Sequence, residues 1–94
     1  MRWIWDPQKN AENQRKHGLS FETAMLVFDD PLAASRLDAS GEEERWQTIG
    51  AIGQVIVFVV HTWPERVGDE EIGRIISARK ATTHERNLYE EGNF

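Results

Sequence analysis

Three cations gather in a short stretch of the chain that otherwise has the pattern of a core strand. The sequence "RIISARKAT" (residues 74–82) holds Arg74, Arg79 and Lys80 and no acid, although the 94-residue chain has a formal net charge of -5. Guanidinium groups match the geometry of phosphate, so the stretch indicates a phosphate-binding site. The alternative is that Arg74 and Arg79 form ion pairs with Glu side chains of a neighbouring strand.

Two further segments place cations beside groups that could exchange protons. "GEEERW" (residues 41–46) sets Glu44 next to Arg45, and on a regular strand these two side chains point to opposite faces. "RKHG" (residues 15–18) places Lys16 and His17 at the expected end of a helix. A cross-strand ion pair would also explain Arg45, and the helix macrodipole alone would favour cations at the second position.

The other candidate residues favour structural roles. His61 lies within an apolar run and is expected to be a hydrogen-bonded residue of the sheet, while His84 is expected to be solvated and Tyr89 to pack a helix on the sheet. The chain has no Cys and only three scattered His, and it carries no phosphate-binding glycine loop or nucleophile motif. We therefore expect neither a metal nor a cofactor.

Length and composition limit the class of protein. The length predicts a single domain over residues 1–94. The chain has 16 acidic and 11 basic residues, which argues against broad, nonspecific binding to nucleic acid, so any basic site has to be local. No apolar run reaches the length of a membrane span, and the first residues show no signal-peptide pattern. We expect a cytoplasmic protein without membrane contact.

Capping residues predict three helices. The Asp-Pro pair at residues 6–7 marks the start of the first helix, and Gly18 marks its end after residue 17. Ser20 caps a second helix, which carries an apolar stripe at helical spacing. Thr82 and Glu85 form a Thr-x-x-Glu capping box that begins a final helix, reaching about residue 91.

Apolar and alternating runs predict the strands. They cover residues 3–5, 32–38, 44–52, 55–63 and 72–80, with a hairpin turn at 53–54 and a long acidic turn at 64–71. The order of elements predicts an α+β fold, in which an antiparallel sheet carries two N-terminal helices and one C-terminal helix. We expect helices on one face of the sheet and a partner-accessible surface on the other.

Side-chain periodicity predicts the core. The expected core residues are Phe21, Met25, Phe28, Ile56, Phe58, Val60 and Ile76. Regular alternation on the last strand would place Arg74, Ile76 and Ala78 on one face and Ile75, Ser77 and Arg79 on the other.

The order of motifs resembles the BrnT family, the toxins of BrnT–BrnA type II toxin–antitoxin modules. The resemblance rests on "KHGLSFE" (residues 16–22), "GEEERWQTIG" (41–50), "VVHT" (59–62) and "RIISARKATTHERNLYE" (74–90), and it extends over residues 5–90. One segment departs from the family, because "TWPERVGDEEIG" (62–73) is longer and more acidic than the usual turn. The resemblance implies a RelE-like fold and a ribonuclease that inhibits translation.

The resemblance also implies a set of site residues. These are Lys16, His17, Glu44, Arg45, Arg79 and Lys80 as catalytic residues, with Arg74, Arg45, Arg79 and Lys80 binding RNA. Metal-free cleavage needs a base for the 2′-hydroxyl, cations for the charged phosphorane and an acid for the leaving oxygen. On this hypothesis Arg79 and Arg45 hold the phosphate, His17 or Glu44 is the base, and His17 or Lys16 is the acid.

Partners follow from the same resemblance. A BrnA-like antitoxin with a ribbon-helix-helix part would neutralise the toxin, and operator DNA would be bound only through the complex of the two proteins. The alternative is a non-catalytic protein-binding module of the same fold, in which acidic side chains of a partner occupy the basic cluster.

Overall fold

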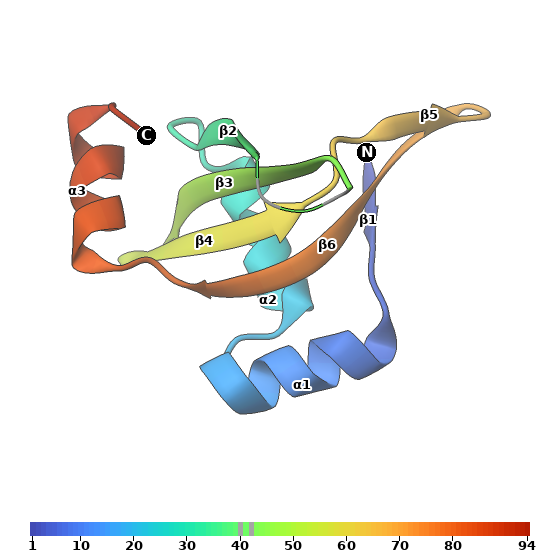
Figure 1. The fold of residues 1–94 in the computed structure, drawn as a ribbon, viewed down its shortest axis with the longest axis horizontal. Coiled ribbons are helices and arrows are strands. Elements are labelled where there is room, and N and C mark those ends of the chain that lie inside the picture. Colours follow the sequence, from blue (N-terminus) through green and yellow to red (C-terminus); the bar gives the residue numbers. More distant parts are fainter. Residues whose placement is uncertain (40, 42) are drawn as a thin grey trace.

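The computed structural model describes residues 1–39, 41 and 43–94, and within them the fold is α+β, as predicted (Figure 1). The helices are α1 (Pro7–His17), α2 (Phe21–Ala24), the 3-10 helix η1 (Met25–Asp29) and α3 (Thr83–Glu91). The strands are β1 (Arg2–Ile4), β2 (Ala34–Asp38), β3 (Arg45–Ile52), β4 (Val55–His61), β5 (Glu65–Val67) and β6 (Glu70–Lys80). The polar loop before β3 includes Ser40 and Glu42, which lie outside the described residues.

The strands form a mixed sheet rather than the antiparallel sheet that the sequence predicts. Its order is β1-β6-β4-β3-β2, and β5 pairs with β6. The β2–β3, β3–β4, β4–β6 and β5–β6 pairs are antiparallel, but β1 runs parallel to β6. The connection between β1 and β6 contains the helices α1, α2 and η1 and the strands β2 to β5, which is ample length for the two strands to pair in parallel. A local strand pattern does not specify such a distant partner.

The segment predicted as one long acidic turn contains a short hairpin. Residues 65–67 form β5, which pairs with the start of β6 through Arg66 opposite Glu71. Gly68 adopts a φ of 63°, which the tight turn requires and which glycine accepts without strain. The hairpin extends away from the rest of the sheet (Figure 1).

Helix α1 begins and ends as the sequence predicts, and asparagine side chains hold it. Asp6 accepts a hydrogen bond from the backbone of Gln8, and Gly18 ends the helix at a φ of 69°. Asn13 donates to the carbonyl oxygen of Ala78 at 2.8 Å and accepts from its N–H at 3.2 Å. Asn13 thus pairs with the edge of β6 as a neighbouring strand would.

The second helix changes its geometry part-way along. Ser20 caps it as predicted, but the α-helix ends at Ala24 and continues as η1. A 3-10 helix repeats every three residues, so Ala24 and Val27 align toward the sheet and both are fully buried. The prediction that Met25 belongs to the core is wrong, because its side chain points outward and is 37% exposed.

A core forms between the sheet and the helices α1, α2 and η1. Its buried members are Phe21, Ala24, Val27, Val57, Val59, Ile75 and Ala78, and Phe28 packs against them. We call this side of the sheet the core face. The prediction is confirmed for Phe21, whereas Ile56, Val60 and Ile76 are only partly buried because they lie on the opposite side.

A bulge in β6 explains why the predicted alternation fails. Val60 pairs with Ser77, but the next residue of β4, His61, pairs with Ile75, so Ile76 is an extra residue. A bulge shifts the alternation by one position, which turns both Ile75 and Ala78 toward the core face. Arg79 and Ser77 consequently point to the opposite side.

The side of the sheet expected to be open is partly covered by α3 and Phe94. Phe58, on β4, is buried there as predicted, and its ring meets the edge of Phe94 at a centroid distance of 6.2 Å. Tyr89 donates to Asp30 at 2.5 Å, which anchors α3 to the loop after η1. This bond raises the pKa of Tyr89 to about 12 and lowers the pKa of Asp30.

Candidate functional site

Four arginines share the side of the sheet opposite the core. They are Arg36 on β2, Arg45 on β3, and Arg74 and Arg79 on β6, and we call this side the arginine face. Cross-strand register explains their placement, because residues directly opposite one another on paired strands point the same way. Arg36 is opposite Gln47, which is opposite Val60, which is opposite Ser77.

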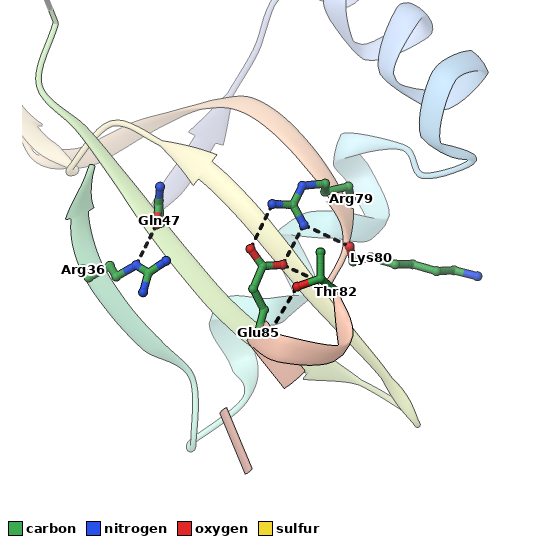
Figure 2. A network of polar contacts seen from close by, with 6 residues as sticks. All are labelled: Arg36, Gln47, Arg79, Lys80, Thr82 and Glu85. Atoms are coloured by element: carbon green, nitrogen blue, oxygen red, sulfur yellow. Dashed lines mark hydrogen bonds and ion pairs between the residues drawn. The ribbon is translucent and has the colours of Figure 1, made fainter. Parts of the chain in front are cut away.

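Arg79 is bound by a carboxylate from α3. Its two terminal nitrogens donate to Glu85 at 2.7 and 3.0 Å (Figure 2). Its guanidinium also lies 4.2 Å from the centroid of the Phe58 ring. The predicted alternative for Arg79 is an ion pair with a Glu of a neighbouring strand, but the observed partner comes from the helix that follows the strand.

Glu85 has a second role, because it completes the predicted capping box of α3. It accepts from the backbone N–H of Thr82 at 2.9 Å, while the Thr82 hydroxyl accepts from the N–H of Glu85. The hydrogen bonds from Arg79 are the main reason that the pKa of Glu85 falls to about 2. The carboxylate therefore carries its charge throughout the physiological pH range.

Arg36 is held in place by contacts that leave the two terminal nitrogens of its guanidinium free of hydrogen bonds among the described residues. Its Nε donates to Gln47 at 2.7 Å, and its guanidinium carbon lies 4.0 Å from the centroid of the Phe94 ring. Within the described part of the chain, its two terminal nitrogens make no hydrogen bond. Arg36 is not among the residues predicted from the sequence. Its position on an edge strand opposite Gln47 depends on a register that the sequence does not reveal.

Arg45 and Arg74 differ in the partners of their guanidinium groups. The Nε of Arg45 is buried and has no hydrogen-bond partner among the described residues. A buried donor without a partner is costly, so an anion that binds Arg45 would relieve this cost. Arg74 instead forms an ion pair with Glu43, a carboxylate of the loop before β3 and not, as the predicted alternative had it, of a strand that neighbours β6.

The remaining candidate residues do not join this cluster. Lys80 is exposed, and its side chain extends away from Arg79 and Glu85 (Figure 2). Lys16 and His17 are exposed in the last turn of α1, beside the edge of β6. No hydrogen bond or ion pair links these three side chains to the arginine face in the part of the structure described.

Glu44 lies toward the core face rather than the arginine face. Its carboxylate accepts from the indole N–H of Trp46 at 3.3 Å, and Trp46 lies opposite the buried His61. Glu44 and Arg45 thus extend to opposite sides, as the sequence indicates. A proton transfer by Glu44 at the arginine face would require its side chain or the preceding loop to move.

His61 is a structural residue, as predicted. It is 1% exposed, and its Nδ1 lies 2.8 Å from the carbonyl oxygen of Thr62, an acceptor that requires Nδ1 to carry the proton. Its Nε2 then accepts from the Thr48 hydroxyl at 2.6 Å. Burial lowers the pKa of His61, so the ring is neutral between the flanking rings of Trp3 and Phe28.

The described residues offer neither a metal-binding cluster nor a membrane-spanning helix. His, Asp and Glu side chains do not gather there in groups that could hold a metal ion. None of the helices in this part of the chain has the length and apolarity that crossing a membrane requires.

Comparison with known families defines the class of protein. The amino-acid sequence matches the model of the family described as the ribonuclease toxin, BrnT, of a type II toxin–antitoxin system, over residues 5–85. This match covers most of the chain, and the protein therefore belongs to the BrnT toxin family. No individual curated protein matches the sequence. Membership in a type II system implies an antitoxin partner.

Proposed function

We propose that this BrnT toxin is a metal-independent endoribonuclease that inhibits translation, and that residues 1–94 act as one RelE-like toxin domain. The observation that supports the proposal is the arginine face, a local cationic surface on a chain with a net charge of -5. A chain of this charge binds RNA poorly overall, so a concentrated cationic site is what it needs to hold a phosphate.

The proposed reaction divides among the predicted residues. A base removes the proton of a ribose 2′-hydroxyl, whose oxygen attacks the adjacent phosphorus, and an acid protonates the 5′-oxygen that leaves. Arg79 and Arg45 hold the phosphate, Lys80 adds charge and Arg74 contacts the flanking backbone. His17 or Glu44 serves as the base and His17 or Lys16 as the acid, and each of these side chains has to move to reach a phosphate on the arginine face, because none contacts that face in the described structure. The products would be a 2′,3′-cyclic phosphate and a 5′-hydroxyl end.

The contacts of Arg79 and Arg45 bear on how a phosphate would enter. Glu85 already occupies both terminal nitrogens of Arg79, so a phosphate at this position exchanges one anion for another. Such an exchange leaves the guanidinium paired throughout and avoids an uncompensated charge. Arg45, whose Nε has no partner in the described residues, would gain a hydrogen bond on binding.

The partner and location belong to the same proposal. We infer that the antitoxin is BrnA-like, with a ribbon-helix-helix part, and that operator DNA is bound only by the toxin–antitoxin complex. A toxin that acts on translation would work in the cytoplasm, without membrane contact.

Incubating the purified protein with RNA in the presence and absence of EDTA tests the proposal. We expect cleavage that EDTA does not reduce, and fragments whose ends carry a cyclic phosphate and a 5′-hydroxyl. Cleavage that disappears with EDTA and returns with a divalent cation would contradict metal independence. Failure to cleave either free or ribosome-bound RNA would contradict the activity itself.

A second candidate function is a non-catalytic protein-binding module of the same fold. A groove of about 720 Å³ favours it, lined by exposed apolar side chains of η1 and of the segment before β5, including Met25, Leu26 and Trp63. An apolar groove of this kind is typical of a protein interface. A protein that binds an antitoxin and has no effect on RNA would support this reading.

A further inference from the structure

Arg36 is the arginine of the face best prepared to bind an anion. The hydrogen bond from its Nε to Gln47 and its position over the Phe94 ring hold the guanidinium in place. Its terminal nitrogens have no hydrogen-bond partner among the described residues, and its side chain is exposed. A guanidinium that is already oriented loses less conformational freedom when a phosphate binds.

Aromatic rings connect Arg36 to the candidate catalytic arginine. The Arg36 guanidinium lies over Phe94, Phe94 and Phe58 meet in an edge-to-face contact, and the guanidinium of Arg79 lies over Phe58. Two cations therefore flank a pair of aromatic rings on this side of the sheet. Single-stranded RNA offers a partner to both kinds of group, because its phosphates bind cations and its bases stack on aromatic rings and guanidinium planes.

We propose that Arg36 and Phe94 form a nucleotide-binding subsite for single-stranded RNA. Arg36 keeps its contacts with Gln47 and the Phe94 ring and holds, through its terminal nitrogens, a phosphate that flanks the one at Arg79, while the attached base packs against the Phe94 ring. The inference rests on the proposed function, because it assumes that RNA is the ligand of the arginine face. It assigns to that site two residues that lie outside the predicted set.

The first test measures affinity for a non-cleavable RNA. A fluorescently labelled single-stranded oligonucleotide with 2′-O-methyl groups is titrated with the wild type, Arg36→Ala and Phe94→Leu over a range of salt concentrations. We expect Arg36→Ala to weaken binding about tenfold and to reduce the salt dependence by roughly one phosphate contact, a slope of about 0.7. Phe94→Leu should weaken binding with an unchanged slope, since it removes stacking and no charge.

Matched controls separate the subsite from general charge and from misfolding. Arg2→Ala removes an arginine with the same charge, exposed and paired with Glu70 at the far end of β6, and should alter affinity by no more than about twofold. Arg36→Lys keeps the charge but loses the fork and the ring contact, so it should retain part of the affinity and the full salt slope. Thermal melting gives the folded fraction of each variant, and the measured affinity is corrected for that fraction.

The outcomes distinguish the subsite from the proposed function. If the wild-type protein cleaves RNA but the Arg36→Ala and Phe94→Leu variants bind RNA as tightly as the wild type, the subsite is overturned. The proposed function is then unaffected. Wild-type protein that neither binds nor cleaves RNA would overturn both. If Arg36→Ala loses no more affinity than Arg2→Ala does, Arg36 contributes only nonspecific charge. That result would also overturn the subsite.

Discussion

At the scale of single residues, the Arg79–Glu85 pair connects the candidate site to the stability of the fold. One carboxylate neutralises Arg79 and also caps α3 through the backbone of Thr82. The side chain of Glu85 is 13% exposed and that of Arg79 is 36% exposed, so solvent screens part of their attraction. Oε1 of Glu85 accepts from both Arg79 and the Thr82 N–H, so a ligand that takes Arg79 from Glu85 changes the charge environment of the carboxylate that caps α3.

The pKa of Glu85 predicts how this pair depends on pH. Its pKa falls from 4.5 to about 2 on folding, so its stabilising effect is complete above about pH 5 and is lost as the pH falls toward 2. We expect Glu85→Gln to lower the free energy of unfolding by on the order of 2 kcal/mol at pH 7, after allowance for screening. The difference from wild type should shrink as the pH is lowered.

Urea titrations of both proteins between pH 7 and about pH 2.5 measure this difference. Glu90→Gln changes an exposed carboxylate on the same helix and serves as the control, with an expected effect within about 0.5 kcal/mol. If the free energies of unfolding of the wild type and Glu85→Gln differ by the same amount over the whole pH range, the ion pair does not stabilise the fold.

At the scale of elements, helix α1 is attached by polar rather than apolar contacts. The helix is almost entirely polar, and its buried residue is Asn13, at 8% exposure. Asn10 assists by accepting from the backbone N–H of Phe21 at 2.8 Å, which fixes the start of α2. The two asparagines explain how a helix with little apolar surface is held beside β6.

Replacing Asn13 should therefore detach this helix. Asn13→Ala leaves the N–H and C=O of Ala78 without partners, and we expect a loss of roughly 2–4 kcal/mol in the free energy of unfolding. Gln14→Ala, at an exposed position of the same helix, should have little effect. Equilibrium unfolding in urea measures both variants, and an Asn13→Ala loss below about 1 kcal/mol would mean that these hydrogen bonds do not anchor α1.

The elements also show what local sequence signals can predict. Caps act over a few neighbouring residues, and the predicted roles of Asp6, Gly18, Ser20 and the Thr82–Glu85 box are all confirmed. The side of the sheet that each residue faces depends on long-range register. The bulge in β6, the parallel pairing of β1 and the 3-10 turn that buries Val27 are all set by tertiary packing.

The candidate site was predictable to the same extent. Residue types in "RIISARKAT" are enough to select Arg79 as a candidate, because a cation on an apolar strand is costly unless it is paired with or binds an anion. The partner of Arg79 was not apparent, although Glu85 had already been recognised as a cap. Arg36 escaped notice because its role depends on Gln47 and Phe94, which are distant in sequence and carry no motif.

At the scale of the whole molecule, an acidic chain carries a local cationic face. Its net charge of -5 disfavours association with RNA in general, whereas the strands of the sheet bring four arginines to one side, where Glu85 and Glu43 pair with Arg79 and Arg74. This arrangement limits binding to RNA segments that can reach the face. An acidic segment of an antitoxin could also bind to the arginine face and block it.

The BrnT family predicts the effect of this protein on a bacterial cell. Expressed without its antitoxin, the protein should arrest growth, and co-expression of the antitoxin encoded beside it should restore growth. Growth curves after induction measure both effects, with soluble protein quantified in the same cultures. Normal growth at high soluble expression would contradict toxicity.

Cleavage of RNA by an Arg79→Ala variant tests the central claim most directly. Arg79 is proposed to stabilise the negative charge that develops on the scissile phosphate, so its loss should reduce the rate about 100-fold or more. Melting and cleavage are measured on the same preparation, and rates are expressed per folded molecule. Arg45→Ala and Lys80→Ala should show smaller losses of the same kind. We predict an Arg79→Ala protein that is folded at the assay temperature and nearly inactive. A folded Arg79→Ala protein that cleaves RNA at the wild-type rate would exclude Arg79 from the site and contradict the assignment of the arginine face.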